Sequence, residues 1–139
     1  ESLRSLLLLA KAHGTRARAY PSYPDREHFG RRSMKMPPGE FEQAIRRQLE
    51  TFLQACRDTG VPMHHIKAHG ALYNDMSWDS ERIELYLKVL RRYRESSRLY
   101  AACRSLLVGQ ARLAGFLVEE EGFADRAYLE NGRLVPRNT

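Results

Sequence analysis

Helical and extended patterns alternate along this chain, and that alternation constrains its fold more than any other feature. Leucines and alanines at helical spacing occupy residues 3–10, and a longer amphipathic stripe runs from Phe41 to Cys56. Further helices are expected at residues 80–93 and 105–115. Short strands are expected at residues 16–20, 61–68, 99–103 and 116–123. Strands separated by helices are typical of an α/β fold with a parallel sheet.

The length of 139 residues suits a single domain that covers residues 1–139. It is too short for a closed (β/α)₈ barrel, which needs about 200 residues or more. The longest purely apolar run, residues 6–10, is far below the roughly 20 residues of a membrane span, and no secretory pattern opens the chain. Cys56 and Cys103 lack a CxxC spacing and are typical of reduced thiols, so we expect a cytoplasmic protein without a membrane partner.

The chain carries a net charge of +6, from 23 basic and 17 acidic side chains, and a basic surface can bind nucleic acid. Here the arginines are spread in small groups along the sequence, and acidic residues stand between them. One group, at residues 91–94, closes an expected helix, where positive charge complements the helix dipole. We therefore expect a solvated surface and no nucleic-acid partner.

The sharpest candidate site is a polar strand. Side chains alternate between the two faces of a strand, so His65, Lys67 and His69 share one face. Ionisable groups are costly in a dry core, and ligands of α/β folds bind at the carboxyl ends of strands, where Gly70 lets the backbone turn closely. We expect Lys67 to clamp an anion or act as a base, and His69 to act as an acid, a base or a metal ligand. Single histidines are more often structural, and we favour that interpretation for His64.

Two further segments carry chemistry that is ambiguous when each is taken alone. A proline-rich loop follows the first expected strand, and in it Asp25 can orient a histidine, bind a metal or act as a base. Arg31 and Arg32 can hold a carboxylate or phosphate, although a stiff surface loop with solvated arginines is the simpler interpretation of this segment. Near the end of the chain, Asp125 and Arg126 favour a structural ion pair.

No cofactor motif stands out in the sequence. It contains no GxGxxG fingerprint, no phosphate-binding P-loop and no GxSxG elbow. A zinc site made from His64, His65 and His69 has weak support, because neighbouring histidines on a strand should point to opposite faces. The identity of any metal ligands therefore stays open.

Three segments together resemble one known family. They are AYPSYPDREHFGRR at residues 19–32, HIKAHGALYN at residues 65–74 and FADRAYLENGRLVPR at residues 123–137. In order and spacing they are similar to the LamB/YcsF family, which is the A subunit of the bacterial 5-oxoprolinase. The resemblance extends from the first helix to Arg137, and composition alone does not explain motifs of this length.

The resemblance implies a distorted (β/α) barrel related to the polysaccharide-deacetylase-like (glycoside hydrolase/deacetylase) fold. It also implies ATP-dependent hydrolysis of the 5-oxoproline lactam to L-glutamate, in the cytoplasm and together with B and C subunits. Phosphorylation of the amide oxygen would explain the need for ATP. The catalytic candidates at matching positions are His69, Lys67 and Asp25. The residues expected to bind the substrate are Ser22, Tyr23, Arg31, Arg32, Tyr73, Asn74, Asp125 and Arg126.

The chain also departs from the family pattern. Tyr20 stands where the family usually has His before PSYPD, and Ala68 stands where it has Pro. An opening segment resembling DLNCDxGE and a later one resembling FHAGD are both missing, so we expect a fragment of a longer barrel, truncated at both ends. Unpaired strand edges in a partial barrel favour a partner or a homo-oligomer. The alternative functions are a non-catalytic remnant or assembly subunit, and an amide or acetyl hydrolase that uses a divalent metal.

Overall fold

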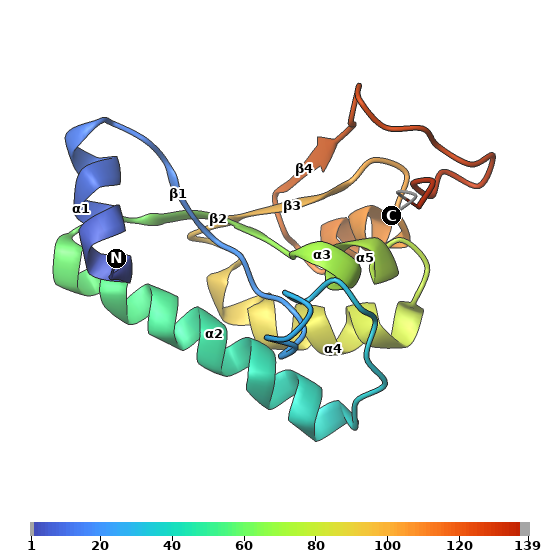
Figure 1. The fold of residues 1–139 in the computed structure, drawn as a ribbon, viewed down its shortest axis with the longest axis horizontal. Helices are drawn as coiled ribbons and strands as arrows, with labels where there is room; N and C mark the ends of the chain where they lie inside the picture. Colours follow the sequence, from blue (N-terminus) through green and yellow to red (C-terminus); the bar gives the residue numbers. More distant parts are fainter. Residues whose placement is uncertain (1, 137–139) are drawn as a thin grey trace.

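The computed structural model describes residues 2–136, which form a parallel four-stranded sheet with helices packed against it (Figure 1). The expected α/β architecture is therefore confirmed for this part of the chain. The elements in order are α1 (Leu3–Ala12), β1 (Ala17–Ala19), α2 (Pro38–Thr59), β2 (Met63–Lys67), α3 (Gly70–Asp75), α4 (Ser80–Leu90), the 3₁₀ helix η1 (Arg91–Tyr93), β3 (Arg98–Ala102), α5 (Leu106–Leu113) and β4 (Val118–Glu121).

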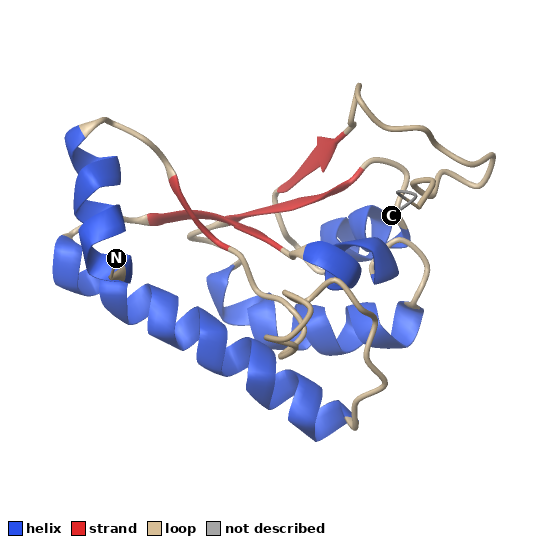
Figure 2. Cartoon of the chain, in the orientation of Figure 1, coloured by secondary structure: helices blue, strands red, loops and turns tan. Residues whose placement is uncertain are grey.

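The two faces of the sheet differ in character. The strand order is β1-β2-β3-β4, and α2, α4 and α5 lie on the same side of it (Figure 2). Ile66, Leu99 and Ala101 are at most 1% exposed and belong to the hydrophobic core. Side chains at the alternate positions, such as Lys67 and Tyr100, are less buried and lie on the other face, which we call the open face. This alternation places the polar strand residues where a ligand can reach them.

A β-bulge in β2 corrects the expectation that His64 and His65 point to opposite faces. Ala17 and Arg18 are consecutive in β1, but they pair with Met63 and His65, so His64 is an extra residue in the ladder. The Nδ1 atoms of His64 and His65 are 3.0 Å apart as a result. The bulge shifts the alternation by one residue, and beyond it His65 and Lys67 share the open face as expected.

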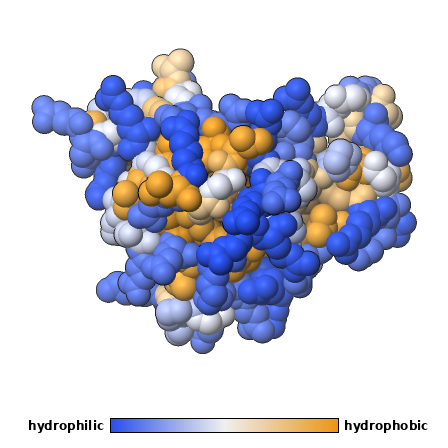
Figure 3. All heavy atoms as spheres, turned by 180° about the vertical axis from the view of Figure 1, so that it is seen from behind, coloured by the Kyte–Doolittle hydropathy of each residue, from blue (hydrophilic) through white to orange (hydrophobic). Residues whose placement is uncertain are grey.

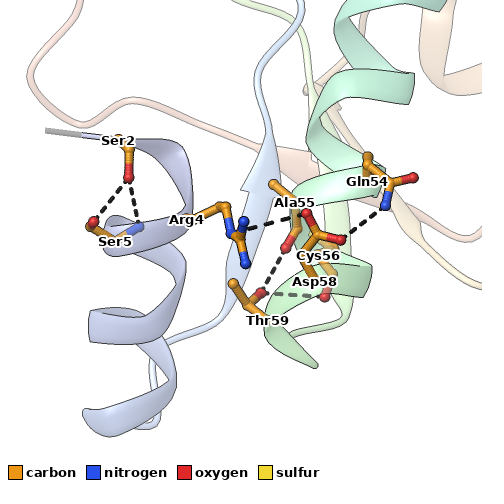
Figure 4. A network of polar contacts seen from close by, with 8 residues as sticks. All are labelled: Ser2, Arg4, Ser5, Gln54, Ala55, Cys56, Asp58 and Thr59. Atoms are coloured by element: carbon orange, nitrogen blue, oxygen red, sulfur yellow. Dashed lines mark hydrogen bonds and ion pairs between the residues drawn. The ribbon is translucent and has the colours of Figure 1, made fainter.

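Helix α2 is the long amphipathic helix predicted from the apolar stripe. It begins at Pro38, three residues before the expected stripe starts at Phe41, and proline suits this first position because its missing N–H costs nothing there. Gly60 closes it with a φ of 67°, in the left-handed region that glycine adopts readily. Close contacts tie α1 to its end: Arg4 lies 4.0 Å from Asp58, and Lys11 Nζ donates to the Thr59 carbonyl at 3.2 Å. Figure 4 shows the Arg4–Asp58 pair.

The short helix α3 was not expected from the sequence. It begins at Gly70, three residues after β2 ends, and buries Leu72 completely. Six residues are too few to show a helical period, and the β2 pattern runs almost directly into them. Three of the strands are shorter than expected, for example Val118–Glu121 instead of residues 116–123, whereas β3 keeps its expected length and is shifted by one residue. Asn131 and Gly132, a pair that favours tight turns, lie between Tyr128 and Leu134, which form an antiparallel bridge.

Within the described residues, no helix is both long enough and apolar enough to cross a membrane. Both cysteines are free thiols, Cys56 buried in α2 and Cys103 half-buried after β3. Viewed from behind, the molecule shows apolar surface bordered by hydrophilic residues (Figure 3). The large exposed apolar side chains include Leu8 and Leu9 of α1 and Leu113 of α5. Exposed apolar surface of this kind is typical of regions that contact further polypeptide.

Candidate functional site

The structure brings the first two sequence motifs together through their backbones. The His69 N–H donates to the Pro21 carbonyl at 2.9 Å, and the Ala71 N–H donates to the Gly30 carbonyl at 3.0 Å. Gly70 has a φ of +61°, and a Cβ atom there would lie 2.5 Å from the Gly30 oxygen. Only glycine allows both this conformation and this approach. The proline-rich loop and the end of β2 therefore form one unit at the carboxyl edge of the sheet.

His69 caps α3 at the centre of this unit. Its Nε2 lies 3.0 Å from the Phe29 carbonyl oxygen, which can only accept, so Nε2 carries the proton. Its Nδ1 is buried and has no hydrogen-bond partner among the described residues. Phe29 itself has a φ of 53°, an uncommon conformation for a large side chain. The result is an imidazole held in one tautomer with an unused Nδ1 lone pair, the form needed for a base or a metal ligand.

A second polar cluster lies on the open face beside this unit. Lys67 Nζ donates to Glu121 Oε2 at 2.9 Å, and the Tyr73 hydroxyl donates to Glu121 Oε1 at 3.1 Å. The Lys67 and Glu121 side chains are 12% and 22% exposed. The Lys67 ammonium also lies 5.4 Å from the Tyr73 ring centroid and 5.5 Å from that of Phe123. A half-buried cation is thus fixed at the end of β2 by one carboxylate and two aromatic rings.

Burial and the Glu121 carboxylate both raise the pKa of Tyr73, so its hydroxyl stays protonated and remains a donor. Glu121 is the residue that sequence reasoning missed. It is the last of three consecutive glutamates in β4, and the strand alternation alone did not show which of them faces Lys67. The register of β4 on β3 decides this, because it places Glu121 opposite Ala102, at the edge of the sheet.

Tyr23 and Ser22 anchor the proline-rich loop rather than project from it. Tyr23 is 2% exposed, and its hydroxyl donates to the buried Asp75 carboxylate, which also accepts from Ser33 Oγ at 2.9 Å. Burial first and Asp75 second raise the pKa of Tyr23, so the phenol stays protonated. The Ser22 N–H donates to Gln48 Oε1 at 3.0 Å. These bonds tie the loop to α2 and α3. The substrate contacts expected for Tyr23 and Ser22 stay a prediction.

The other loop candidates lie nearer to solvent. Asp25 accepts from the backbone N–H and Nδ1 of His28, at 3.2 and 3.0 Å, and its hydrogen bond to that ring lowers the pKa of the carboxyl group. It therefore orients a histidine, one of the roles expected for it. Arg31 and Arg32 are exposed and form no ion pair within the described residues. Their guanidinium groups remain available to an anion.

The third family-like segment, residues 123–137, contacts the site mainly through the Phe123 ring, which lies beside the Lys67 ammonium. Asp125 is exposed, whereas Arg126 is half-buried and its Nη2 donates to the Val135 carbonyl at 2.9 Å. Neither side chain forms an ion pair within the described residues, so the structural ion pair expected for them is not found there. Asn74 of α3 is exposed. Arg137, the last matching position, lies outside the described residues.

Comparison with known proteins decides the family. The model of the LamB/YcsF family matches residues 1–139. The chain belongs to the LamB/YcsF family. It is 35% identical over 136 residues to the A subunit of 5-oxoprolinase from Neisseria meningitidis, and 37% identical over 135 residues to that of Histophilus somni. A crystal structure of the lactam utilization protein from Thermus thermophilus superposes with a TM-score of 0.88 at 34% identity.

These matches use nearly all of this chain but only part of each LamB/YcsF relative. They cover 98% of the chain and 56% of the Neisseria protein, 97% and 55% of the Histophilus protein, and 97% and 55% of the Thermus structure. The chain thus spans about half the length of these relatives. The close superposition confirms that its helices and strands are arranged as in the Thermus lactam utilization protein, consistent with a (β/α) barrel-like domain.

Tyr20, at which the sequence is expected to depart from the family pattern, lies at the site itself. Its ring packs edge-on against His69, with the ring centroids 4.6 Å apart, and the Arg18 guanidinium lies 4.4 Å from its centroid. A side chain at position 20 is therefore in direct contact with the candidate catalytic imidazole. The tyrosine places a phenol ring and a hydroxyl beside that imidazole.

The three-histidine zinc set is not assembled in the described residues, where no three His, Cys, Asp or Glu side chains are grouped to hold a metal. His64 and His65 lie together at the bulge, near the start of β2, while His69 follows its other end. His65 is 8% exposed and stacks on Tyr100 with a centroid distance of 4.0 Å. Burial, assisted by His64 and Arg18, lowers the pKa of His65 to about 4, so its ring is neutral at pH 7.

Proposed function

We propose that this chain supplies part of the catalytic site of the A subunit of a 5-oxoprolinase. In this proposal it hydrolyses the 5-oxoproline lactam to L-glutamate at the expense of ATP, together with B and C subunits. The observation that carries the proposal is the convergence of two family motifs on His69, beside the Lys67–Glu121–Tyr73 cluster. Family membership, and the naming of its relatives as the A subunit of 5-oxoprolinase, support the choice of substrate.

The chemistry of 5-oxoproline suits these side chains. The substrate is a small cyclic amide with one carboxylate, and the exposed Arg31 and Arg32 can pair with that carboxylate. The Lys67 ammonium and the Tyr73 hydroxyl can stabilise negative charge that develops on the lactam oxygen. His69, whose tautomer is fixed by the Phe29 carbonyl, can accept a proton at Nδ1 from attacking water once a movement of the surrounding side chains exposes that buried atom.

ATP would make the stable amide reactive. Transfer of the γ-phosphoryl group to the lactam oxygen releases ADP and leaves an O-phosphorylated imidate, whose ring carbon is open to attack by water. Water adds to that carbon, and the ring nitrogen takes up a proton and leaves, which gives an acyl phosphate bridged by the original lactam oxygen. A second water attacks the acyl carbon, so that the C–O bond breaks, glutamate forms and the bridging oxygen leaves with phosphate. Label placed in the 5-oxoproline carbonyl oxygen should then appear in released phosphate, and phosphate without label would contradict this route.

The function is tested by ADP and glutamate release from 5-oxoproline and ATP. The chain is mixed with the B and C subunits of a related enzyme, and His69→Ala is compared with His13→Ala, which alters an exposed histidine at the end of α1. We expect His69→Ala to lose about 100-fold or more of the activity and His13→Ala to retain it. Equal activity of both variants would refute the role of His69. No release from a correctly folded chain would favour a non-catalytic role in the assembly.

A further inference from the structure

The segment that follows β4, residues 123–135, forms a unit of its own, which we call the flap. Figure 1 shows it, in red, leaving the sheet after β4 before it turns back. Leu129 N–H donates to the Arg133 carbonyl at 2.8 Å, and Val135 N–H donates to the Ala127 carbonyl at 2.9 Å, which makes a hairpin. Within the described residues, every hydrogen bond of the flap joins two of its own residues. Side-chain packing therefore holds the flap to the rest of the molecule.

The base of the flap covers the Lys67 cluster. The Phe123 ring centroid lies 5.5 Å from the Lys67 ammonium, and the ring packs edge-on against Tyr73 at a centroid distance of 6.0 Å. Phe123 N–H donates to the Tyr128 hydroxyl at 2.8 Å, which joins the covering residue to the hairpin. Burial, Glu121 and, more weakly, Tyr128 raise the pKa of Tyr73, so the Tyr128 hydroxyl lies near the same cluster. A movement of the hairpin is therefore passed on to the ring that covers Lys67.

The tip of the flap makes a second contact, at the turn that follows α3. The Arg133 guanidinium lies 5.0 Å from the ring centroid of Trp78. A Cβ atom on Gly132 would lie 3.7 Å from the Cβ of Arg104, which comes two residues after β3 ends. Arg133 forms no ion pair within the described part of the chain. An exposed cation–π contact is weak, so this contact closes the flap and can also release it.

Gly122 separates the flap from β4. It is exposed, and a Cβ atom there would meet one further atom within 4 Å, the Cys103 sulfur at 3.9 Å. Tyr128 and Leu129 of the hairpin are 39% and 47% exposed, so the flap buries little apolar surface. Segments with few buried contacts open at a low cost in free energy, and a few loop residues absorb such a movement. The flap can therefore open at Gly122 while the sheet stays intact.

We propose that the flap opens and closes over the Lys67–Glu121–Tyr73 cluster, and that Arg133 on Trp78 is the latch that holds it closed. In the closed state the Phe123 ring excludes water from the Lys67 ammonium, which strengthens the electrostatic interactions of that group. In the open state the ammonium is reached from solvent. That the molecule admitted is 5-oxoproline rests on the proposed function. The movement itself is inferred from the contacts of the flap and is measured without catalysis.

Acetylation of lysines by an N-hydroxysuccinimide ester measures the opening, because the rate at Lys67 follows the population of the open state. The full chain is labelled briefly, and acetylated peptides are quantified by mass spectrometry. Lys88 is the internal control, since it also lies 2.9 Å from a glutamate but is 60% exposed on α4. Arg133→Gln removes the latch and should raise the Lys67 rate about two- to fivefold, the range expected for one exposed cation–π contact. The Lys88 rate should stay unchanged.

Arg92→Gln is the matched control variant. Arg92 is also exposed and also lies over an aromatic ring, that of Tyr93, at 5.5 Å from its centroid. Its replacement should leave the rates at both lysines unchanged. Equal Lys67 rates in Arg133→Gln and Arg92→Gln would overturn the proposal.

A disulfide gives the opposite perturbation. The separation of 3.7 Å between the two Cβ positions is close to the mean of about 3.8 Å in disulfides, so Arg104→Cys and Gly132→Cys should join on oxidation. Cys103→Ser is added to prevent a wrong pairing. We expect Lys67 to react more slowly in the oxidised chain than after reduction, and Lys88 to react equally in both. Equal Lys67 rates would overturn the proposal, and failure of the disulfide to form would contradict the closed contact.

Labelling and activity together separate this proposal from the proposed function. Lys67 labelling that responds to Arg133→Gln, in a chain that releases no glutamate in the presence of B and C subunits, would retain the flap and reject the activity. Release of ADP and glutamate by a chain whose Lys67 labelling does not respond would do the reverse.

Discussion

The close approach of Gly70 to Gly30 makes a sharp prediction about stability. Gly70→Ala places a methyl group 2.5 Å from the Gly30 carbonyl oxygen, where ordinary contact begins at 3.4 Å, so the loop must retreat by roughly an ångström. That movement stretches the Ala71–Gly30 and His69–Pro21 hydrogen bonds, each worth about 1 kcal/mol. The positive φ adds about 1 kcal/mol. We expect the free energy of unfolding to fall by about 3 kcal/mol.

Substitutions at two other glycines separate the cost of the positive φ from the cost of the close contact. Gly14→Ala introduces the same left-handed strain, at a φ of +64°, but its Cβ meets nothing within 4 Å. Gly39→Ala introduces neither strain nor contact at the start of α2. Urea unfolding should therefore show a loss of about 1 kcal/mol for Gly14→Ala and no loss for Gly39→Ala. If Gly70→Ala lost no more stability than Gly14→Ala, the two motifs would not be joined as described.

Two further perturbations address the open face. The lowered pKa of His65, about 4 instead of 6.5, means that the unfolded chain binds more protons below pH 6.5, so stability should fall by up to about 3 kcal/mol between pH 6.5 and 4. His65→Phe keeps the stack on Tyr100 and should flatten this part of the urea-unfolding pH profile; an unchanged slope would contradict the assignment. Glu121→Gln should reduce product release at least about tenfold and stability by about 1 kcal/mol. Glu42→Gln, which breaks a more exposed pair with Lys88, should change neither by a comparable amount.

Much of the fold could be predicted because its signals are local. The stripe from Phe41 to Cys56 has a helical period, and a helix exists there because that stripe buries Phe41, Ile45 and Leu49 against the sheet and α4. The alternation that placed Lys67 on a polar face could be predicted because successive side chains of any strand point to opposite faces. Helix α3, with six residues, has no period to detect.

The parts of the site that escaped prediction depend on pairing between distant segments. The bulge at His64 is visible only in the register of β2 with β1. It brings together the rings of His64 and His65, which simple strand alternation would place on opposite faces. Glu121 became a site residue because β4 pairs with β3 at one particular register. The sequence predicted that Tyr23 binds the substrate. In the structure its hydroxyl donates a hydrogen bond to Asp75, which lies 52 residues further along the chain.

The most direct test of the central claim is product release by Lys67→Met, compared with Lys88→Met. Both changes remove an ammonium group that lies 2.9 Å from a glutamate, but Lys88 is 60% exposed on α4 and distant in the fold from the motifs. The assay follows ADP and glutamate from 5-oxoproline and ATP in the presence of B and C subunits. We expect Lys67→Met to lose about 100-fold or more while Lys88→Met stays active. Equal rates in the two variants would contradict a catalytic site at the carboxyl edge of this sheet.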